Sequence, residues 1–224
     1  MRSRYSLIVF ALVAAGALVH AQGILTADQF FANLSANYAK ISDYEAQISV
    51  NAGSQTMAGT VIYKAPTLMR MDFTQPAGQV ISYNGTSLIV YVPELRATLS
   101  QQTSATTNAA AASGEGLRML ARNYSISYLS GPEPVALSAA ESESVVKLML
   151  TRKTVAEGFR NITLSVNPAT MLIRRMEGIT LAGDTIVYSF SGFRLNQGIP
   201  DTRFIYDSPA SANVYNNFLF STDN

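Results

Sequence analysis

The side chains that most often carry enzyme chemistry are scarce in this sequence. The chain has 224 residues, with one His and no Cys. Without Cys it has no thiol nucleophile, disulfide or Cys-ligated metal, and a single His, His20, cannot form a multi-His metal site. We therefore expect no metal and no other cofactor, and we expect that the protein is not an enzyme.

Two pairs of carboxylates have a spacing that could serve acid–base hydrolysis. Asp43 with Glu45, and Glu141 with Glu143, stand two residues apart, which puts each pair on one face of an extended strand. Paired surface charges are much commoner than catalytic pairs, and Glu141 and Glu143 lie in a polar, turn-like stretch. A hydrolase is therefore the third interpretation, behind two kinds of binding protein.

The overall charge excludes further classes of protein. Only 14% of the residues are charged and 48% are hydrophobic, with 16 basic and 15 acidic side chains, whereas ordinary soluble domains carry about 25% charged residues. A nucleic-acid binder would show a basic surplus, and a disordered chain would show low hydrophobicity or high net charge. We expect a folded protein that binds no nucleic acid.

Residues 1–21 have the pattern of a secretory signal peptide. Two arginines precede an apolar run over 7–19, and Val19-His20-Ala21 resembles a cleavage site. The run is shorter than the roughly 20 residues of a transmembrane helix. We expect cleavage after Ala21 and a single domain over 22–224, which then contains no His for a catalytic triad.

The elements that follow are one helix and many strands. Apolar residues recur at helical spacing over 26–41, with a capping box formed by Thr26 and Gln29. From Tyr44 the apolar period changes to two, the prolines fall at strand ends, and Asn84-Gly85 predicts a hairpin. We expect a loop over 101–116, because its sequence is low-complexity Ala, Ser and Thr, and a short helix over 117–123.

The second half of the chain also predicts strands. The candidates are 124–128, 145–152, 160–166, 171–179, 185–195 and 204–206. Ten or so strands in sequence, with one N-terminal helix and one short helix in mid-chain, indicate a single, strongly curved antiparallel sheet. Methionine suits surfaces that accept apolar ligands of varied shape, and an uncovered concave apolar face would form a binding cavity.

Five segments, taken in order, resemble the periplasmic outer-membrane lipoprotein carrier family (LolA). They are a glycine-led strand ending in proline, an alternating strand ending in proline, a hairpin leading to a tyrosine-bearing strand, a short apolar helix, and late strands followed by a Phe-x-Tyr motif. These segments are 59–66, 69–76, 83–93, 117–123 and 184–208.

The resemblance implies a mainly β (α+β) fold, a half-open β-barrel of about eleven strands covered by the N-terminal helix and a short lid helix. It implies a periplasmic chaperone that holds the acyl chains of lipoproteins in a hydrophobic cavity and moves them from the inner to the outer membrane. The implied partners are acylated lipoproteins, an inner-membrane ABC lipoprotein-releasing transporter and an outer-membrane acceptor. We expect the carrier to be a monomer.

The resemblance also assigns roles to individual positions. The residues implied in the lipid-binding cavity are Val61, Tyr63, Met69, Met71, Phe73, Ile81, Ile89, Tyr91, Leu117, Leu120, Ile162 and Leu164. Those implied in the lid and its gating are Leu34, Tyr38, Leu117 and Leu120.

The sequence departs from the family at one gating position. The family usually has an Arg directly before the first proline, where it contacts the lid, and here that residue is Ala65. Lys64 is adjacent, but neighbouring strand residues point to opposite faces. Related half-barrels also occur in periplasmic envelope-stress sensors and in glycolipid carriers, so a lipid-sensing module and a glycolipid carrier are the alternative interpretations.

Overall fold

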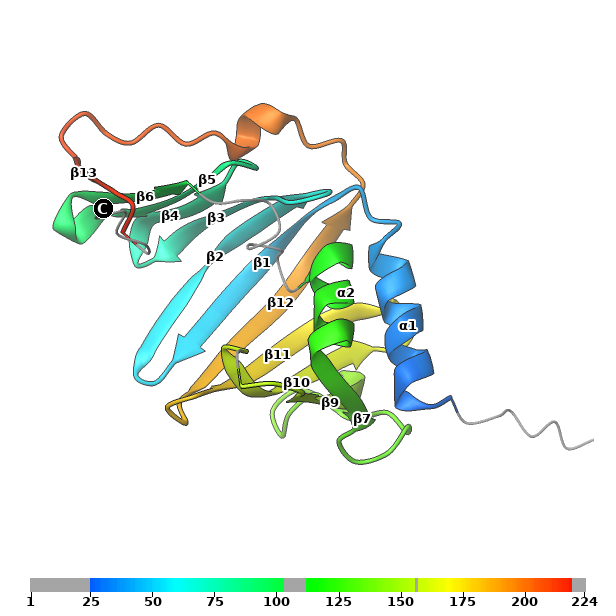
Figure 1. The fold of residues 1–224 in the computed structure, drawn as a ribbon. Coiled ribbons are helices and arrows are strands. Elements are labelled where there is room, and N and C mark those ends of the chain that lie inside the picture. The colour runs from blue at the N-terminus through cyan, green and yellow to red at the C-terminus, as the bar shows by residue number, and fades with distance from the viewer. Residues whose placement is uncertain (1–24, 103–111, 156, 219–224) are drawn as a thin grey trace, which may run out of the picture.

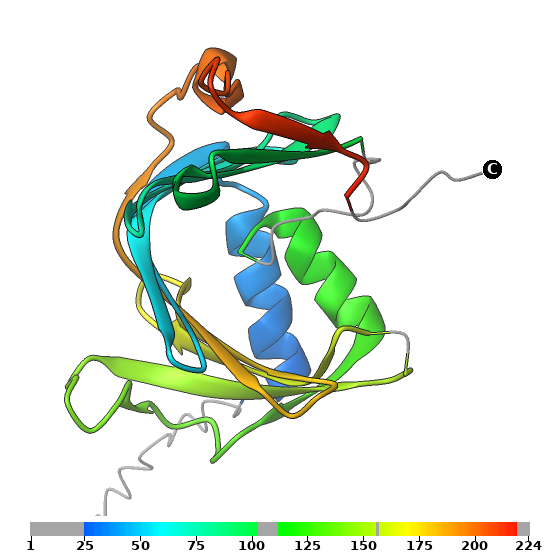
Figure 2. The same cartoon turned by 90° about the vertical axis from the view of Figure 1, so that its left-hand side faces the viewer.

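This computed structural model describes residues 25–102, 112–155 and 157–218. In these residues, alternation of apolar and polar side chains builds one curved sheet of 13 strands. The sheet curls around two helices, which both lie on its concave side (Figure 1, Figure 2). This agrees with the expected mainly β fold with a curved, unclosed sheet. The predicted signal peptide lies outside the described residues.

The sheet is two meanders joined side by side. In the first, consecutive strands pair antiparallel: β1 (Asp43–Ala52), β2 (Gln55–Lys64), β3 (Leu68–Gln75), β4 (Ala77–Tyr83), β5 (Ser87–Val92) and β6 (Ala97–Gln102). The second runs through β7 (Tyr124–Tyr128), β9 (Ser144–Arg152), β10 (Phe159–Asn167), β11 (Leu172–Thr180) and β12 (Thr185–Leu195). Antiparallel pairing of β1 with β12 connects them.

Two short strands complete the sheet. β8 (Val135–Ala136) pairs with β9, and β13 (Asn213–Asn216) lies parallel to β6 at the sheet edge. The sequence did not predict β13, because a parallel pairing with a strand more than 100 residues earlier has no local signal. The strand predicted over 204–206 is wrong: a 3-10 turn, η3 (Asp201–Phe204), precedes an irregular segment there.

The predicted turn signals lie where the chain reverses. The side chain of Asn84 accepts hydrogen bonds from the backbone N–H groups of Thr86 and Ser87, and Gly85 has a φ of +98°. Pro66 and Pro76 lie between strands, and Pro93 begins the 3-10 turn η1 (Pro93–Leu95) after β5. Proline does little harm at such positions because its missing N–H belongs to no ladder.

One glycine lets β2 and β3 approach closely. The register of the two strands shifts between Ala58 and Gly59. A Cβ atom on Gly59 would lie 2.2 Å from the carbonyl oxygen of Asp72, so no other residue fits without moving the strand. Such bulges bend a sheet and strengthen its twist.

Helix α1 (Ala27–Tyr38) is a fixed part of the core. Its capping box forms as predicted, with the Thr26 hydroxyl accepting from Gln29 N–H and the Gln29 side chain accepting from Thr26 N–H. The helix ends before Ile41, the predicted end. Its far end is anchored because the buried Tyr38 hydroxyl accepts a hydrogen bond from Ile173 N–H at 3.0 Å.

Helix α2 (Gly114–Asn123) starts earlier than the sequence predicts. The Ser113 hydroxyl accepts from Gly116 N–H and caps the helix. The loop predicted over 101–116 is therefore wrong at both ends, since 101–102 belong to β6 and 114–116 belong to α2; residues 103–111 lie outside the described residues. Neither described helix has the length and apolar content needed to cross a membrane.

The C-terminal segment 196–217 covers the outer face of β2 to β6. Phe204 and Ile199 pack on Ile62 as a small second core, and the Phe204 carbonyl accepts from the Ser82 hydroxyl at 2.7 Å. Asp43, only 2% exposed, holds the start of this segment, because its two carboxylate oxygens accept from the N–H groups of Gln197 and Gly198.

Replacing the buried carboxylate should loosen this segment. We expect Asp43→Ala to lower the free energy of unfolding by about 2 kcal/mol or more, because two backbone donors lose their acceptor. Chemical denaturation measures the change, and Asp207→Ala, an exposed carboxylate on the same segment, is the matched control. Equal stability of the two variants would show that the Asp43 contacts contribute little.

Candidate apolar binding site

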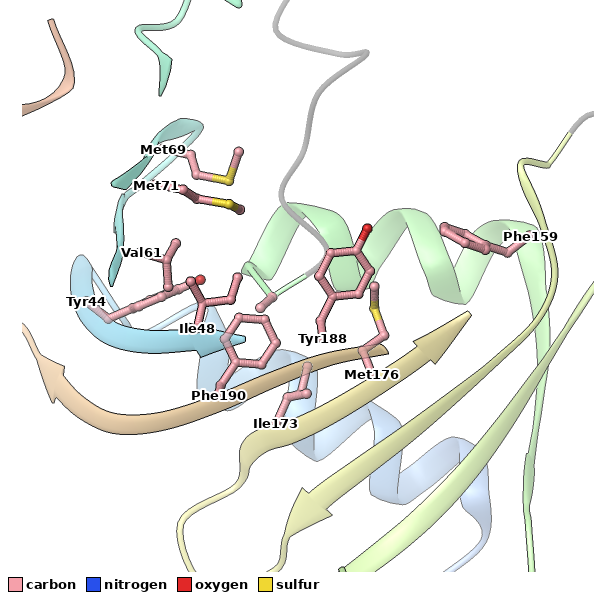
Figure 3. Close-up of a pocket in the computed structure, with 11 residues that line it drawn as sticks. Tyr44, Ile48, Val61, Met69, Met71, Phe159, Ile173, Met176, Tyr188 and Phe190 are labelled. Atoms are coloured by element: carbon pink, nitrogen blue, oxygen red, sulfur yellow. The ribbon is translucent and has the colours of Figure 1, made fainter. Parts of the chain in front are cut away.

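The concave face of the sheet contains an apolar cavity of about 270 Å³. Its wall is built from strands of both meanders and from the residue that leads into α2 (Figure 3). The lining residues are Tyr44, Ile48, Val61, Met69, Met71, Ala112, Phe159, Ile173, Met176, Tyr188 and Phe190.

Strand pairing explains why these side chains converge. Residues directly opposite each other on antiparallel strands point to the same face. Val61 on β2 pairs with Met71 on β3, and Met176 on β11 pairs with Tyr188 on β12. Curvature of the sheet then turns the two pairs toward each other across one hollow.

The cavity is electrically neutral. None of the described residues that line it carries a charged side chain. Burial raises the pKa of the Tyr44 hydroxyl well above its ordinary value, with smaller contributions from nearby tyrosines, and burial also raises the pKa of Tyr188. Both hydroxyls therefore stay protonated at ordinary pH. Such a cavity favours an uncharged, apolar ligand.

The structure brings together most of the residues that the sequence assigned to a cavity. Val61, Met69 and Met71 line it. Five others lie on the same concave face and pack in or against its core: Tyr63, Phe73, Ile81, Ile162 and Leu164. Leu117 and Leu120 pack on that core from α2.

Ile89 and Tyr91 were expected in the cavity and lie on the opposite face. Ile81 pairs with Val90, so Val90 continues the concave row and Ile89 does not. Tyr91 lies under the C-terminal segment, with its ring 5.9 Å from that of Tyr206. The reason is the length of the turn over 84–87, because one residue more or less in a hairpin reverses the face of the next strand.

Sequence reasoning missed the contribution of β1 and β12. Tyr44 and Ile48 belong to a clear apolar alternation on β1, and Tyr188 and Phe190 to one on β12. That period-two signal could have identified both strands as cavity walls. Phe159 had no such signal, because it reaches the site across a register shift near the start of β10.

The four residues expected in the lid differ in how deeply they are buried. Leu34 and Tyr38 on α1 and Leu117 on α2 are at most 2% exposed and belong to the main core. Leu120 is half-buried and packs against that core from outside. Of the four, only Leu120 has the exposure of a residue at the edge of a cover.

Hydrogen bonds between hydroxyl groups connect α2 to the sheet. The Tyr63 hydroxyl donates to the Pro66 carbonyl at 2.9 Å and hydrogen-bonds the Ser113 side chain. Ser113 in turn accepts from Gly116 N–H. Burial raises the pKa of Tyr63, and the Ser113 hydrogen bond opposes this more weakly.

Ala65 lies beside these hydrogen bonds. A small cavity of about 120 Å³ lies where the end of α1, the start of α2 and the β2–β3 turn meet. The residues that line it are Tyr38, Ala39, Ile41, Tyr63, Ala65, Pro66, Gly114, Glu115 and Arg118. Lys64 points elsewhere, to the Ile199 carbonyl and Asp201. The connection between sheet and α2 at this point therefore runs through Tyr63 rather than through position 65.

The carboxylate pairs are engaged in structural contacts. Glu45 forms an ion pair with Arg194, Glu141 with Arg175 and Glu143 with Arg174, while Asp43 holds the C-terminal segment. Among the residues that the structure describes, no group of His, Asp or Glu side chains could hold a metal ion.

The family model for the outer membrane lipoprotein carrier protein LolA matches residues 46–207. None of the curated proteins matches the sequence.

Solved structures match the chain at low sequence identity. An uncharacterized conserved protein from Thermus thermophilus is 12% identical, with a TM-score of 0.56 over 85% of this chain and 98% of that one. MucB in the Pseudomonas aeruginosa MucA/MucB complex is 11% identical, with a TM-score of 0.50 over 84% and 63%. A LolA superfamily protein from Nitrosomonas europaea is 14% identical, with a TM-score of 0.41 over 81% and 98%.

Removing the Tyr63 hydroxyl should weaken the attachment of α2. We expect Tyr63→Phe to lower the free energy of unfolding by about 1 kcal/mol and to speed amide hydrogen exchange in the first turn of α2. Tyr91→Phe, on the opposite face of the sheet, should change neither. Unaltered exchange at Gly116 and Leu117 in Tyr63→Phe would contradict this role.

Proposed function

Because the chain belongs to the outer membrane lipoprotein carrier protein LolA family, we propose that it binds the acyl chains of lipoproteins on its concave face and carries them from the inner to the outer membrane. The observation that carries this proposal is the neutral cavity of about 270 Å³, walled by methionine, aromatic and aliphatic side chains. An acyl chain has no charge and no hydrogen-bonding group along its length, so this wall suits it.

The proposed carrier works in the periplasm. The pattern of residues 1–21 supports export and cleavage after Ala21. Loading by an inner-membrane ABC transporter and delivery to an outer-membrane acceptor follow from the family and belong to the proposal. Nothing in the proposed transfer breaks a covalent bond, so the protein acts as a carrier and not as an enzyme.

Release sets a limit on how tightly the cavity holds its cargo. Burial contributes roughly 0.8 kcal/mol per methylene, so one fully buried sixteen-carbon chain would gain about 12 kcal/mol. Several fully buried chains would pass the practical ceiling of about 18 to 21 kcal/mol. We propose that α2 is the cover that opens to admit and release cargo, because it buries one large side chain, Leu117, whereas α1 buries Phe30, Phe31, Leu34 and Tyr38.

The same cavity could serve a lipid sensor or a glycolipid carrier. MucB, whose fold is similar, is found in complex with MucA, which is a protein partner rather than a cargo. The identity of the bound molecule separates these functions. Lipoproteins recovered with the protein from the periplasm would support the carrier, and glycolipid or free phospholipid would support the alternatives.

A charge placed in the cavity should reduce cargo binding. We expect Met71→Glu to lower the amount of acylated protein that co-purifies by about tenfold or more, because a carboxylate in an apolar site must be desolvated. Mass spectrometry of the purified protein measures the cargo. Leu117→Glu is a poorer choice, since Leu117 is fully buried and the variant would lose its fold.

The matched control uses the opposite face of the same sheet. Ile89→Glu introduces the same carboxylate on β5, where Ile89 points away from the cavity. It should keep cargo at the wild-type level, with folding of both variants checked by circular dichroism. Equal cargo in Met71→Glu and wild type would refute the proposed binding site.

A further inference from the structure

A second apolar hollow lies next to the first, beneath α2. Its volume is about 340 Å³. The residues that line it are Gly116, Met119, Leu120, Asn123, Tyr124, Glu157, Gly158, Phe159, Ile162 and Met176. We call the cavity described above the first compartment and this hollow the second compartment.

Two side chains stand between the compartments. Phe159 and Met176 line both of them. Figure 3 shows the Phe159 ring at the far end of the first compartment from Tyr44, with Met176 on the side of Tyr188. The two hollows are therefore neighbours, with Phe159 and Met176 as shared lining residues.

The partition is held in place from two directions. A Cβ atom on Gly178 would lie 2.6 Å from the Phe159 ring, so the ring rests directly on the glycine backbone of the neighbouring strand. The Tyr124 hydroxyl donates to the Phe159 carbonyl at 3.1 Å and fixes its backbone to β7. A ring that is fixed by its backbone and seated on a glycine is a stable wall.

The sizes of the compartments set the ligand that each can take. An apolar cavity of about 150 Å³ binds one benzene, or roughly 25 Å³ per carbon. At this ratio the first compartment has room for roughly eleven carbons of a chain and the second for roughly fourteen. Neither compartment takes two chains, and each takes most of one.

We propose that the site binds a lipid with two acyl chains on one headgroup, with one chain in each compartment and Phe159 between them. This rests on the proposed function and names the class of cargo for the same site. Asn123 and Glu157, the polar residues of the second compartment, are half-buried. They would therefore lie near the headgroup end of the lipid rather than deep among the methylenes. Phe159 is then the residue that keeps the chains apart.

Closing one compartment at a time tests the proposal. Met71→Trp fills the first compartment, and Met119→Trp on α2 fills the second; both positions are half-buried. Met149→Trp is the matched control, because Met149 lies between the inward-facing Leu148 and Leu150 on β9 and points to the outer face. Thermal unfolding confirms that each variant folds, and Leu120→Phe replaces Met119→Trp if that variant does not.

Native mass spectrometry with a single-chain probe, dodecanoate, gives the first readout. We expect two molecules bound to the wild type and to Met149→Trp, and one to Met71→Trp and to Met119→Trp. A dipalmitoylglyceryl-cysteine peptide should bind once, and each filled compartment should weaken its binding by about tenfold or more. Phosphatidylglycerol vesicles with the same chains identify the source: preference for the lipopeptide indicates a lipoprotein, and preference for the phospholipid indicates a membrane lipid.

The inference and the proposed function can fail separately. If Met119→Trp binds both probes like the wild type while Met71→Trp loses them, the second compartment holds no chain and the inference is wrong, although acyl binding in the first compartment stands. If the wild type binds neither dodecanoate nor either two-chain lipid, the proposed function is wrong as well.

Discussion

The two helices cover the concave apolar face of the sheet only in part, and this determines most of what the molecule can do. Every strand that alternates in this sheet presents an apolar row inward, and the described chain supplies two helices, the longer of 12 residues, to cover those rows. Helix α1 packs one face against the main core, and its end is held by the Tyr38 hydrogen bond to β11. The space that remains between the helices and the curved sheet forms the two compartments. A flat sheet or a third helix would remove them.

The two helices have different attachments, and this difference matters for any model of release. Helix α1 contributes several fully buried side chains, including Phe31 and Leu34, so moving it would expose much of the main core. Helix α2 buries one large side chain, Leu117. The Tyr63 and Ser113 hydroxyls hold its start, and Lys153 donates to the Ala121 and Arg122 carbonyls at its end. Hydrogen bonds of this kind contribute only about 1 kcal/mol each. The cover with the smaller energetic cost of opening is therefore α2.

Much of the fold was predictable because its signals are local. Thr26 and Gln29 predict the capping box that forms, and Asn84-Gly85 predicts the hairpin that forms. Val61, Met69 and Met71, which the resemblance assigned to a lipid-binding cavity, line the apolar cavity of the structure. Ile89 and Tyr91 were placed on the wrong face, because the register after a hairpin depends on turn length rather than on the pattern within the strand. Phe204 was assigned to a strand, whereas its side chain anchors an irregular segment on Ile62.

The pattern of residues along the chain indicates a curved β-sheet with an apolar inward face, and the composition, with no Cys and one His, excludes thiol chemistry and multi-His metal sites. These follow from residue type and from periods of two and 3.6, which each short segment carries on its own. Three contacts are visible only in the folded structure: the pairing of β1 with β12, the contact of the Phe159 ring with Gly178, and the hydrogen bond between Tyr63 and Ser113. Those contacts join residues far apart in the chain, and they depend on strand register and sheet curvature, which no local pattern specifies.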